Sequence, residues 1–251
     1  MGLKKDLRRL INRYLGLDIV KYSPGPSEVC WWITKYDIDL VLDVGANIGQ
    51  FANSLFKMGY EGSVLSFEPL SREYEELLSR SRSNPKWMVA ERCAIGDIDG
   101  EIEINISENS LGSSHLLPTQ KLLMASPGSG FVGSEKVKMY KLSTIAPPFL
   151  KNFKSPFLKI DVQGFEDQVL KGATEILADI KGLEIELSFV PLYEGQTVCE
   201  DMLGKIRQLG FYLHDLKPFF EDEKGQILQA EAMFFKNGYT PVRHRSMAKR
   251  T

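Results

Sequence analysis

The stretch LVLDVGANIGQFANSL, from Leu40 to Leu55, predicts a β-strand that runs through a glycine turn into a helix. Gly45 allows a sharp turn of the backbone, and Gly49 allows the next helix to approach a ligand closely. Asn47 stands between them and is one of the few residues with a side chain that tolerate a left-handed conformation. A dinucleotide fingerprint needs glycine at positions 45, 47 and 50, so two of its three glycines are missing here.

Carboxylates at the predicted strand ends narrow the choice of ligand. Asp43, at the end of the first strand, repels a pyrophosphate and attracts an ammonium or sulfonium cation. Glu68 follows in SFEP at close to the spacing, about 20 residues, of a carboxylate that binds a ribose diol. Asp97, in CAIGD after the third predicted strand, could accept a hydrogen bond from an adenine amino group.

Ribose, adenine and a cationic tail together describe S-adenosylmethionine. The expected cofactor-binding residues are Asp43, Gly45, Asn47, Gly49, Glu68 and Asp97. The alternative is a tight strand-to-helix turn with ordinary solvated carboxylates at the strand ends.

The alternation of apolar runs and helical patterns predicts an α/β domain with a mostly parallel sheet and helices on both faces. We expect seven strands, the third from Trp87 to Ile95, and an antiparallel hairpin made by the last two. The expected α/β domain spans residues 38–238 and contains an irregular insertion at about 98–156. A helical extension at 1–37 precedes it, and a solvated tail at 239–251 follows.

Composition limits the partners. The formal net charge is −2 and the sequence pI about 6.0, so we expect no nucleic-acid partner. Three cysteines without CxxC spacing favour neither a disulfide framework nor a zinc site, which fits a reducing, cytoplasmic setting. No run is long and apolar enough to cross a bilayer. The amphipathic segment from Leu3 to Leu17 is expected to pack on the domain or on a partner subunit. The alternative is that it lies on an anionic membrane surface. The sequence leaves the oligomeric state open.

The motifs resemble the FkbM-type family of S-adenosylmethionine-dependent methyltransferases. The resemblance runs from about Val41 to Lys236 through VLDVGANIGQF, SFEP, CAIGD, LKIDVQGFEDQVLKGA and EIELSFVPLYEGQ. It implies a Rossmann-like class I fold, O-methylation of hydroxyls on sugars, glycans or natural-product scaffolds, and the same six cofactor positions. Gln163 departs from the pattern, because the family often has Glu there.

An alcohol acceptor must lose its proton to a base at the carboxyl edge of the sheet. Asp161 and Glu186 are predicted at that edge. The alternatives are a helix-capping carboxylate for Asp161 and, for Glu186 with Glu184, a merely polar strand face. His115, in the insertion, is a third candidate as base or acceptor ligand, or is simply solvated.

Ser113, Ser114 and Tyr193 are candidate contacts of a small-molecule or saccharide acceptor. Trp31 and Trp32 are expected to pack in the core, with a platform for a sugar ring as the alternative. We expect no metal ion, because no ligand spacing demands one. The rival functions are N-methylation of a small amine and a non-catalytic, cofactor-binding accessory protein.

Overall fold

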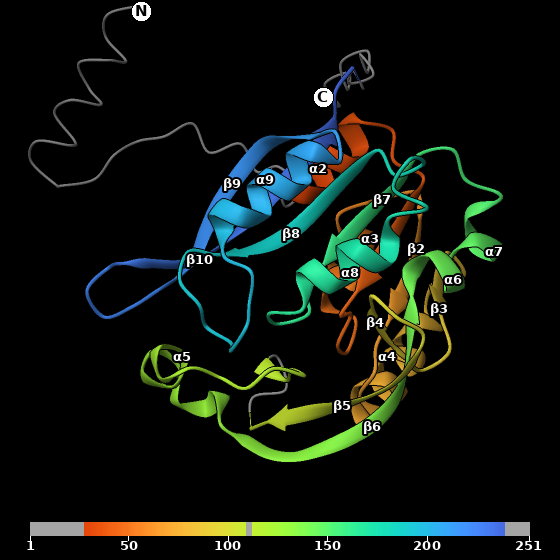
Figure 1. Cartoon of the computed structure of the whole chain (residues 1–251). Helices are drawn as coiled ribbons and strands as arrows, with labels where there is room; N and C mark the ends of the chain where they lie inside the picture. Colours follow the sequence, from red (N-terminus) through yellow and green to blue (C-terminus); the bar gives the residue numbers. More distant parts are fainter. Residues whose placement is uncertain (1–27, 109–111, 239–251) are drawn as a thin grey trace, which may run out of the picture.

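The computed structural model describes residues 28–108 and 112–238 of the chain. Seven strands form one sheet in the order β3-β2-β1-β7-β8-β10-β9 (Figure 1). β10 is antiparallel to both of its neighbours, and the other strand pairs of this sheet are parallel. The strands are β1 (Leu40–Val44), β2 (Ser63–Phe67), β3 (Trp87–Val89), β7 (Pro156–Ile160), β8 (Gly182–Ser188), β9 (Phe211–Glu221) and β10 (Ile227–Lys236). The predicted mostly parallel seven-stranded sheet with an antiparallel last hairpin is confirmed.

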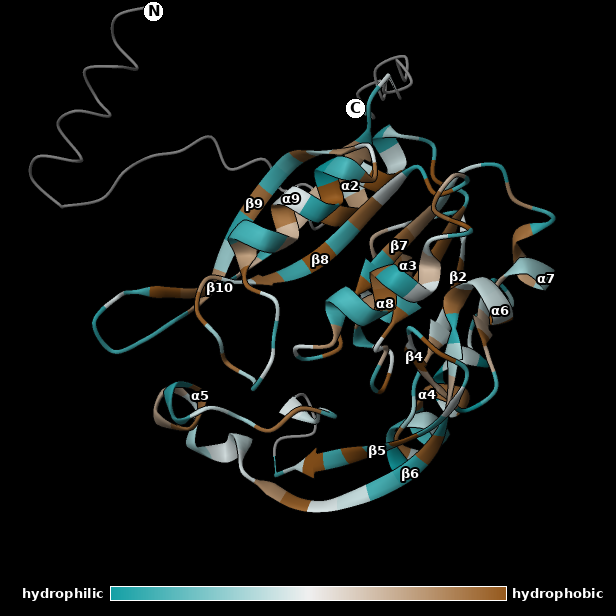
Figure 2. Cartoon of the chain, viewed as in Figure 1, coloured by the Kyte–Doolittle hydropathy of each residue, from teal (hydrophilic) through white to brown (hydrophobic). Residues whose placement is uncertain are grey.

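Helices cover both faces of the sheet, as predicted. Alternate residues of β1 point to opposite faces: Val41 packs with α2, α3 and α4, whereas Leu40 and Leu42 pack with α6, α8 and α9. Enclosing a leucine such as Leu55 of α3 contributes about 1.5–3 kcal/mol. The helices are α2 (Glu28–Lys35), α3 (Gln50–Lys57), α4 (Ser71–Ser81), α6 (Leu142–Ile145), α8 (Glu166–Ala173) and α9 (Cys199–Gln208). In Figure 2 the outward surfaces of α8 and α9 are largely hydrophilic.

The expected third strand, Trp87 to Ile95, is wrong as a single element. β3 ends at Val89, and the chain resumes at β4 (Ala94–Gly96) in a second, three-stranded sheet of order β4-β6-β5. The break follows from the polar run between them, where Glu91 is exposed and Arg92 forms a 2.9 Å ion pair with Glu135 of β6. A strand inside the first sheet would have had to bury this pair.

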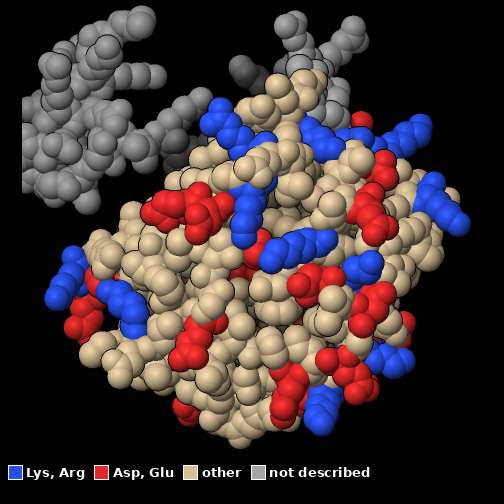
Figure 3. All heavy atoms as spheres, viewed as in Figure 1, with Lys and Arg blue, Asp and Glu red and all other residues tan. Residues whose placement is uncertain are grey.

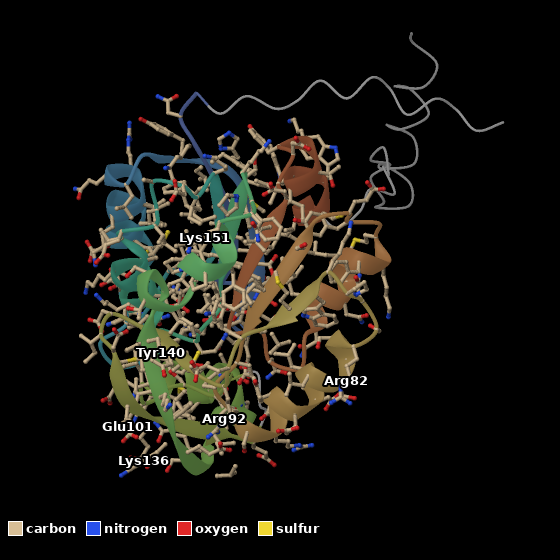
Figure 4. The ribbon with its side chains drawn as sticks, turned by 90° about the vertical axis from the view of Figure 1, so that its right-hand side faces the viewer. Arg82, Arg92, Glu101, Lys136, Tyr140 and Lys151 are labelled. Atoms are coloured by element: carbon tan, nitrogen blue, oxygen red, sulfur yellow. The ribbon has the colours of Figure 1, made fainter. Side chains whose placement is uncertain are left out.

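The second sheet is an arm that reaches across the carboxyl edge of the first (Figure 1). β5 (Gly100–Ser107) and β6 (Phe131–Lys141) pair antiparallel. Between them lie α5 (Gln120–Ala125) and a short 3-10 turn, η2 (Pro127–Ser129); α7 (Pro147–Leu150) follows α6. Glu101 and Lys136 lie on the outer side of this sheet (Figure 4).

The tip of the arm is attached to the last hairpin and to the loop after β8. Lys121 of α5 forms a 2.7 Å ion pair with Asp222 in the β9–β10 turn. The backbone N–H of Thr119 donates to the carbonyl of Leu192 at 2.8 Å, and Leu122, Leu192 and Leu228 pack together. The arm therefore closes over the edge where parallel strands end.

The predicted N-terminal helix and C-terminal tail lie outside the described residues. Within the described residues, none of the helices is long and apolar enough to span a membrane. Acidic and basic side chains are intermixed over the face seen in Figure 3, in keeping with the small net charge.

Candidate active site

The glycine turn joins β1 to α3 with three residues in the left-handed region. φ is 80° at Gly45, 49° at Asn47 and 82° at Gly49, so the left-handed conformation predicted for Asn47 is confirmed. The Asn47 side-chain oxygen accepts hydrogen bonds from the N–H of Ile48 at 2.8 Å and from the Gln50 amide at 3.0 Å. These local bonds hold asparagine in a conformation that most residues avoid.

Gly45 brings the loop after β7 against this turn. A methyl group at Gly45 would stand 1.9 Å from the carbonyl oxygen of Asp161, and the Asp161 N–H donates to Val44 at 3.1 Å. Only glycine allows both the positive φ and this close approach. Asp161 is therefore fixed beside the glycine turn by the backbone itself.

Glu68 connects the end of β2 to the same turn. Its carboxylate accepts hydrogen bonds from the N–H of Asn47 at 2.7 Å and of Leu70 at 2.9 Å. Burial raises the pKa of Glu68 to about 7, and the two hydrogen bonds oppose that rise. Each oxygen keeps a second lone pair with which it can accept a ribose hydroxyl, so its predicted role as a cofactor ligand stays a prediction.

Asp43 lies inside the sheet rather than at the lip of the turn. It is fully buried, with one oxygen 3.4 Å from Lys159 Nζ and the other accepting a 3.3 Å hydrogen bond from Ser66. Burial raises the pKa of Asp43, and Lys159 partly offsets the rise. Asp43 can therefore act on a bound cation through its electrostatic field, and its contact with the cofactor stays a prediction.

Asp161 and Glu186, the two predicted edge carboxylates, come together at the ends of β7 and β8. The amide nitrogen of Gln163 lies 3.0 Å from Asp161 Oδ1 and 3.3 Å from Glu186 Oε2. The Asp161 side chain is 40% exposed. Both oxygens of Glu186 are occupied, one by Gln163 and the other by the Gln229 amide. Asp161 is thus the carboxylate that an acceptor can reach.

Lys159 lies among three carboxylates on one face of the sheet. Its Nζ is 3.3 Å from Asp161 and 3.4 Å from Asp43, and Glu184 is its register neighbour on β8. Burial lowers the pKa of Lys159, but the carboxylates outweigh burial and hold the pKa above its usual value. One cation among three carboxylates leaves this region negative, which favours a cationic ligand nearby.

The remaining predicted residues divide into two groups. Ser114 donates to the carbonyl of Gln163 at 2.6 Å, and the Tyr193 hydroxyl lies 3.0 Å from Gln163 Oε1, so these two join the cluster. His115 turns away: its Nδ1 is 2.8 Å from the Glu103 carbonyl. Ser113 accepts a hydrogen bond from the backbone of Ser107. The hydrogen bonds described for Ser113 and His115 lead to other parts of the arm and not to Asp161.

Asp97 follows β4 of the second sheet, so it does not end a third strand of the first. The expected series of carboxylates on three successive strands is corrected accordingly, and a contact of Asp97 with adenine stays a prediction. Glu166 lies in the first turn of α8 and accepts hydrogen bonds from the backbone N–H of Val162 and Gly164.

A cavity of about 340 Å³ lies on the α2 and α3 side of the sheet. Its aromatic and charged lining residues are Trp32, Phe51, Lys159, Glu184, Asp215, Lys217 and Glu231. Glu184 is 6% exposed, and its Oε2 has no hydrogen-bond partner among the described residues. Burial raises the pKa of Glu184 to about 8, partly offset by Lys159. Lys159 thus both lines this cavity and contacts Asp161.

Residues 43–213 match the model of the methyltransferase FkbM domain, which includes the glycine turn and both edge carboxylates. The chain belongs to the FkbM methyltransferase family. Members of this family are S-adenosylmethionine-dependent methyltransferases. The strand order described above is that of their Rossmann-like class I fold.

Two curated relatives of this FkbM chain are methyltransferases. Hexuronic acid methyltransferase AglP of Haloferax volcanii is 25% identical over 149 residues, which cover 59% of this chain and 56% of that protein. Methyltransferase sdnD of Sordaria araneosa is 26% identical over 156 residues, which cover 54% of this chain and 60% of that protein. The chain therefore spans little more than half the length of the relatives it matches.

Solved structures are similar at lower identity. TehB from Haemophilus influenzae shares 11% identity at a TM-score of 0.48, covering 91% of this chain and 66% of TehB. Magnesium protoporphyrin IX methyltransferase from Synechocystis, solved with S-adenosylmethionine, shares 12% sequence identity at a TM-score of 0.45. The match covers 94% of this chain and 98% of that protein.

The residues of this FkbM domain fit S-adenosylmethionine, the methyl donor of the family. Asp43 Oδ1 is buried and, among the described residues, has the ion pair with Lys159 at 3.4 Å but no hydrogen bond, and the carboxylates around Lys159 suit a sulfonium charge. Gly45, Asn47, Gly49 and Glu68 would hold the donor at the ends of β1 and β2.

Sequence reasoning missed Lys159, Gln163 and Gln229. Lys159 could have been predicted from the sequence. It is a single basic residue in an apolar strand, and because side chains two positions apart lie on the same face of a strand, it lies on the same face as Asp161. Gln229 carried none, since its approach to Glu186 depends on the antiparallel register of β10 with β8.

Proposed function

We propose that this protein transfers a methyl group from S-adenosylmethionine to a hydroxyl group of a sugar, glycan or related polyhydroxylated scaffold. The observation that carries the proposal is the position of Asp161. Its backbone lies against Gly45 of the glycine turn, and its carboxylate is exposed at the same edge. A base for the acceptor and the loop for the donor therefore adjoin, which gives the proximity that a two-substrate displacement needs.

The residues divide the chemical work between them. When bound, S-adenosylmethionine supplies a methyl group that is already activated. Asp161 accepts the proton of the acceptor hydroxyl, so that the oxygen gains nucleophilic character. Lys159 Nζ lies 3.3 Å from Asp161 and helps to hold this carboxylate in place beside the glycine turn. An amine acceptor would not need such a base, and the exposed carboxylate therefore favours a hydroxyl.

The cavity beside Lys159 suits a hydroxylated ring. Trp32 and Phe51 offer aromatic surface, and Glu184 and Glu231 offer oxygens that accept hydrogen bonds from hydroxyls. AglP acts on a hexuronic acid by its name. In this chain, the lysines of the cavity lining, Lys159 and Lys217, are matched by Asp215 and Glu231, and Glu184 adds a third carboxyl group. The lining therefore has no excess of positive charge for a carboxylate ligand, which favours a neutral ring over a uronic acid.

Transfer of an isotopically labelled methyl group tests this proposal. Purified protein and labelled S-adenosylmethionine are added to an extract of the source cells, and the labelled products are identified by mass spectrometry and NMR. We expect the label on an oxygen of a neutral sugar or polyhydroxylated compound. Label on a nitrogen, or no labelled product while the donor is bound, would contradict the proposal.

A further inference from the structure

Gln163 lies at the centre of the hydrogen bonds that link Asp161 and Glu186 to the arm. Its amide nitrogen is within 3.0 Å of Asp161 and 3.3 Å of Glu186. Its side-chain oxygen is 3.0 Å from the Tyr193 hydroxyl, and its backbone carbonyl accepts a 2.6 Å hydrogen bond from Ser114. The two hydrogens of one amide group are thus shared between two carboxylates.

The backbone at Gln163 is strained, and this strain indicates that the position of the Gln163 side chain is functionally important. φ is 54° at Gln163 and 99° at Gly164. A left-handed conformation costs about 1–2 kcal/mol for a residue with a side chain. A side chain at Gly164 would contact the Tyr193 ring at 3.0 Å, so the ring and the turn fix each other. This conformation aims the Gln163 amide at the space between Asp161 and Glu186.

The surroundings are crowded with carboxylates, and the neutral amide separates two of them. Lys159 is the cation that touches Asp161. The other titratable groups that act on Glu186 or Asp161 from the packed elements are Asp43, Glu166, Glu184, Glu231 and Tyr193. A carboxylate at position 163 would stand at hydrogen-bond distance from both Asp161 and Glu186 and would repel both.

We propose that Gln163 is the positioning residue of the base: its uncharged amide holds Asp161 and Glu186 side by side and keeps the exposed Asp161 carboxylate turned to the acceptor. The inference rests on the proposed function for the role of Asp161 as base. It adds that this chain needs an amide at position 163, where the family often has Glu, because its Asp161 and Glu186 both lie at hydrogen-bond distance from that side chain. Through Ser114, Gln163 also connects the arm to the loop that carries Asp161, and through Tyr193 it connects the loop after β8 to the same place.

Titration of Glu186 by carboxyl carbon-13 NMR tests the proposal without any acceptor. The Glu186 signal is assigned by its loss in E186Q. Burial, with the charges of Asp161 and Glu166, already raises the pKa of Glu186, and the Gln163 hydrogen bond opposes that rise. We therefore expect the Glu186 midpoint to rise by about one unit in Q163L and in Q163E. The matched control Q208E makes the same substitution at an exposed position of α9 and should leave the midpoint unchanged. An unchanged midpoint in both Gln163 variants overturns the proposal.

The rate of methyl transfer separates positioning from a merely structural role. Q163L should lower the maximal rate at least tenfold at all pH values, with donor affinity retained. Q163E has the same shape, so its deficit should shrink as the pH falls from about 8 to about 6 and the new carboxyl takes up a proton. Equal rates of Q163E and wild type throughout would contradict the proposal. If no acceptor is ever methylated, the proposed function fails, while the NMR titration still decides the role of Gln163 in holding Glu186.

Discussion

Asp161→Asn is expected to slow methyl transfer by about 10²- to 10⁴-fold, the usual contribution of a positioned general base. Asparagine has nearly the same shape, but its single side-chain oxygen can accept only one of the two hydrogen bonds that Lys159 and Gln163 now donate to separate oxygens of Asp161, and it cannot take a proton from the acceptor. Donor affinity, measured by calorimetry, should change by no more than about twofold. The loss therefore falls on the maximal rate, as for a residue that acts in the transition state.

Glu101→Gln provides the control for this experiment. Glu101 is an exposed carboxylate on β5, on the outer side of the small sheet (Figure 4), and its replacement removes the same charge. Its maximal rate should match that of the wild type. A rate for Asp161→Asn within about threefold of wild type would remove Asp161 from the chemistry.

Gly45→Ala is expected to abolish donor binding and to lower the free energy of unfolding by several kcal/mol. Alanine at φ 80° costs about 1–2 kcal/mol by itself. Its methyl group would also stand 1.9 Å from the Asp161 carbonyl oxygen and 2.9 Å from its carbon, so backbone must move. Either the glycine turn or the loop that carries Asp161 is displaced. Urea unfolding and donor titration measure the two effects separately.

Gly59→Ala isolates the cost of the conformation. Gly59 has φ 89°, and a methyl group there would meet no atom within 4 Å. The free energy of unfolding of Gly59→Ala should fall by only about 1–2 kcal/mol, and this variant should bind the donor like the wild type. If Gly45→Ala proved as stable as Gly59→Ala and bound the donor equally well, the close packing of Asp161 on the turn would have no energetic importance.

The parts of the site that could be predicted from the sequence depend on local backbone chemistry. Gly45, Asn47 and Gly49 mark a turn whose conformations follow from the residue types. Asp161 and Glu186 follow parallel strands, and the ends of such strands meet at one edge. The proximity of Asp161 and Glu186 could therefore be predicted once their two strands were placed side by side in the sheet.

The parts that could not be predicted depend on pairings between distant segments. Gln229 reaches Glu186 through the register of β10 with β8. The division of the third strand depends on the pairing of β4 with β6, which lies across the whole insertion. Apolar residues on both sides of Glu91 and Arg92 suggest one strand, and only the second sheet shows why the chain leaves the first.

Calorimetric titration with S-adenosylmethionine tests the central claim, donor binding at the glycine turn, most directly. We expect saturable binding at one site in the wild type and in Glu75→Ala, an exposed position on α4. Glu68→Ala should bind about 10- to 100-fold more weakly, because a carboxylate that accepts hydrogen bonds at the end of β2 is lost. Thermal unfolding of each variant verifies that it is folded. Equal affinity of folded Glu68→Ala and wild type, or no binding by folded wild type, would contradict the account.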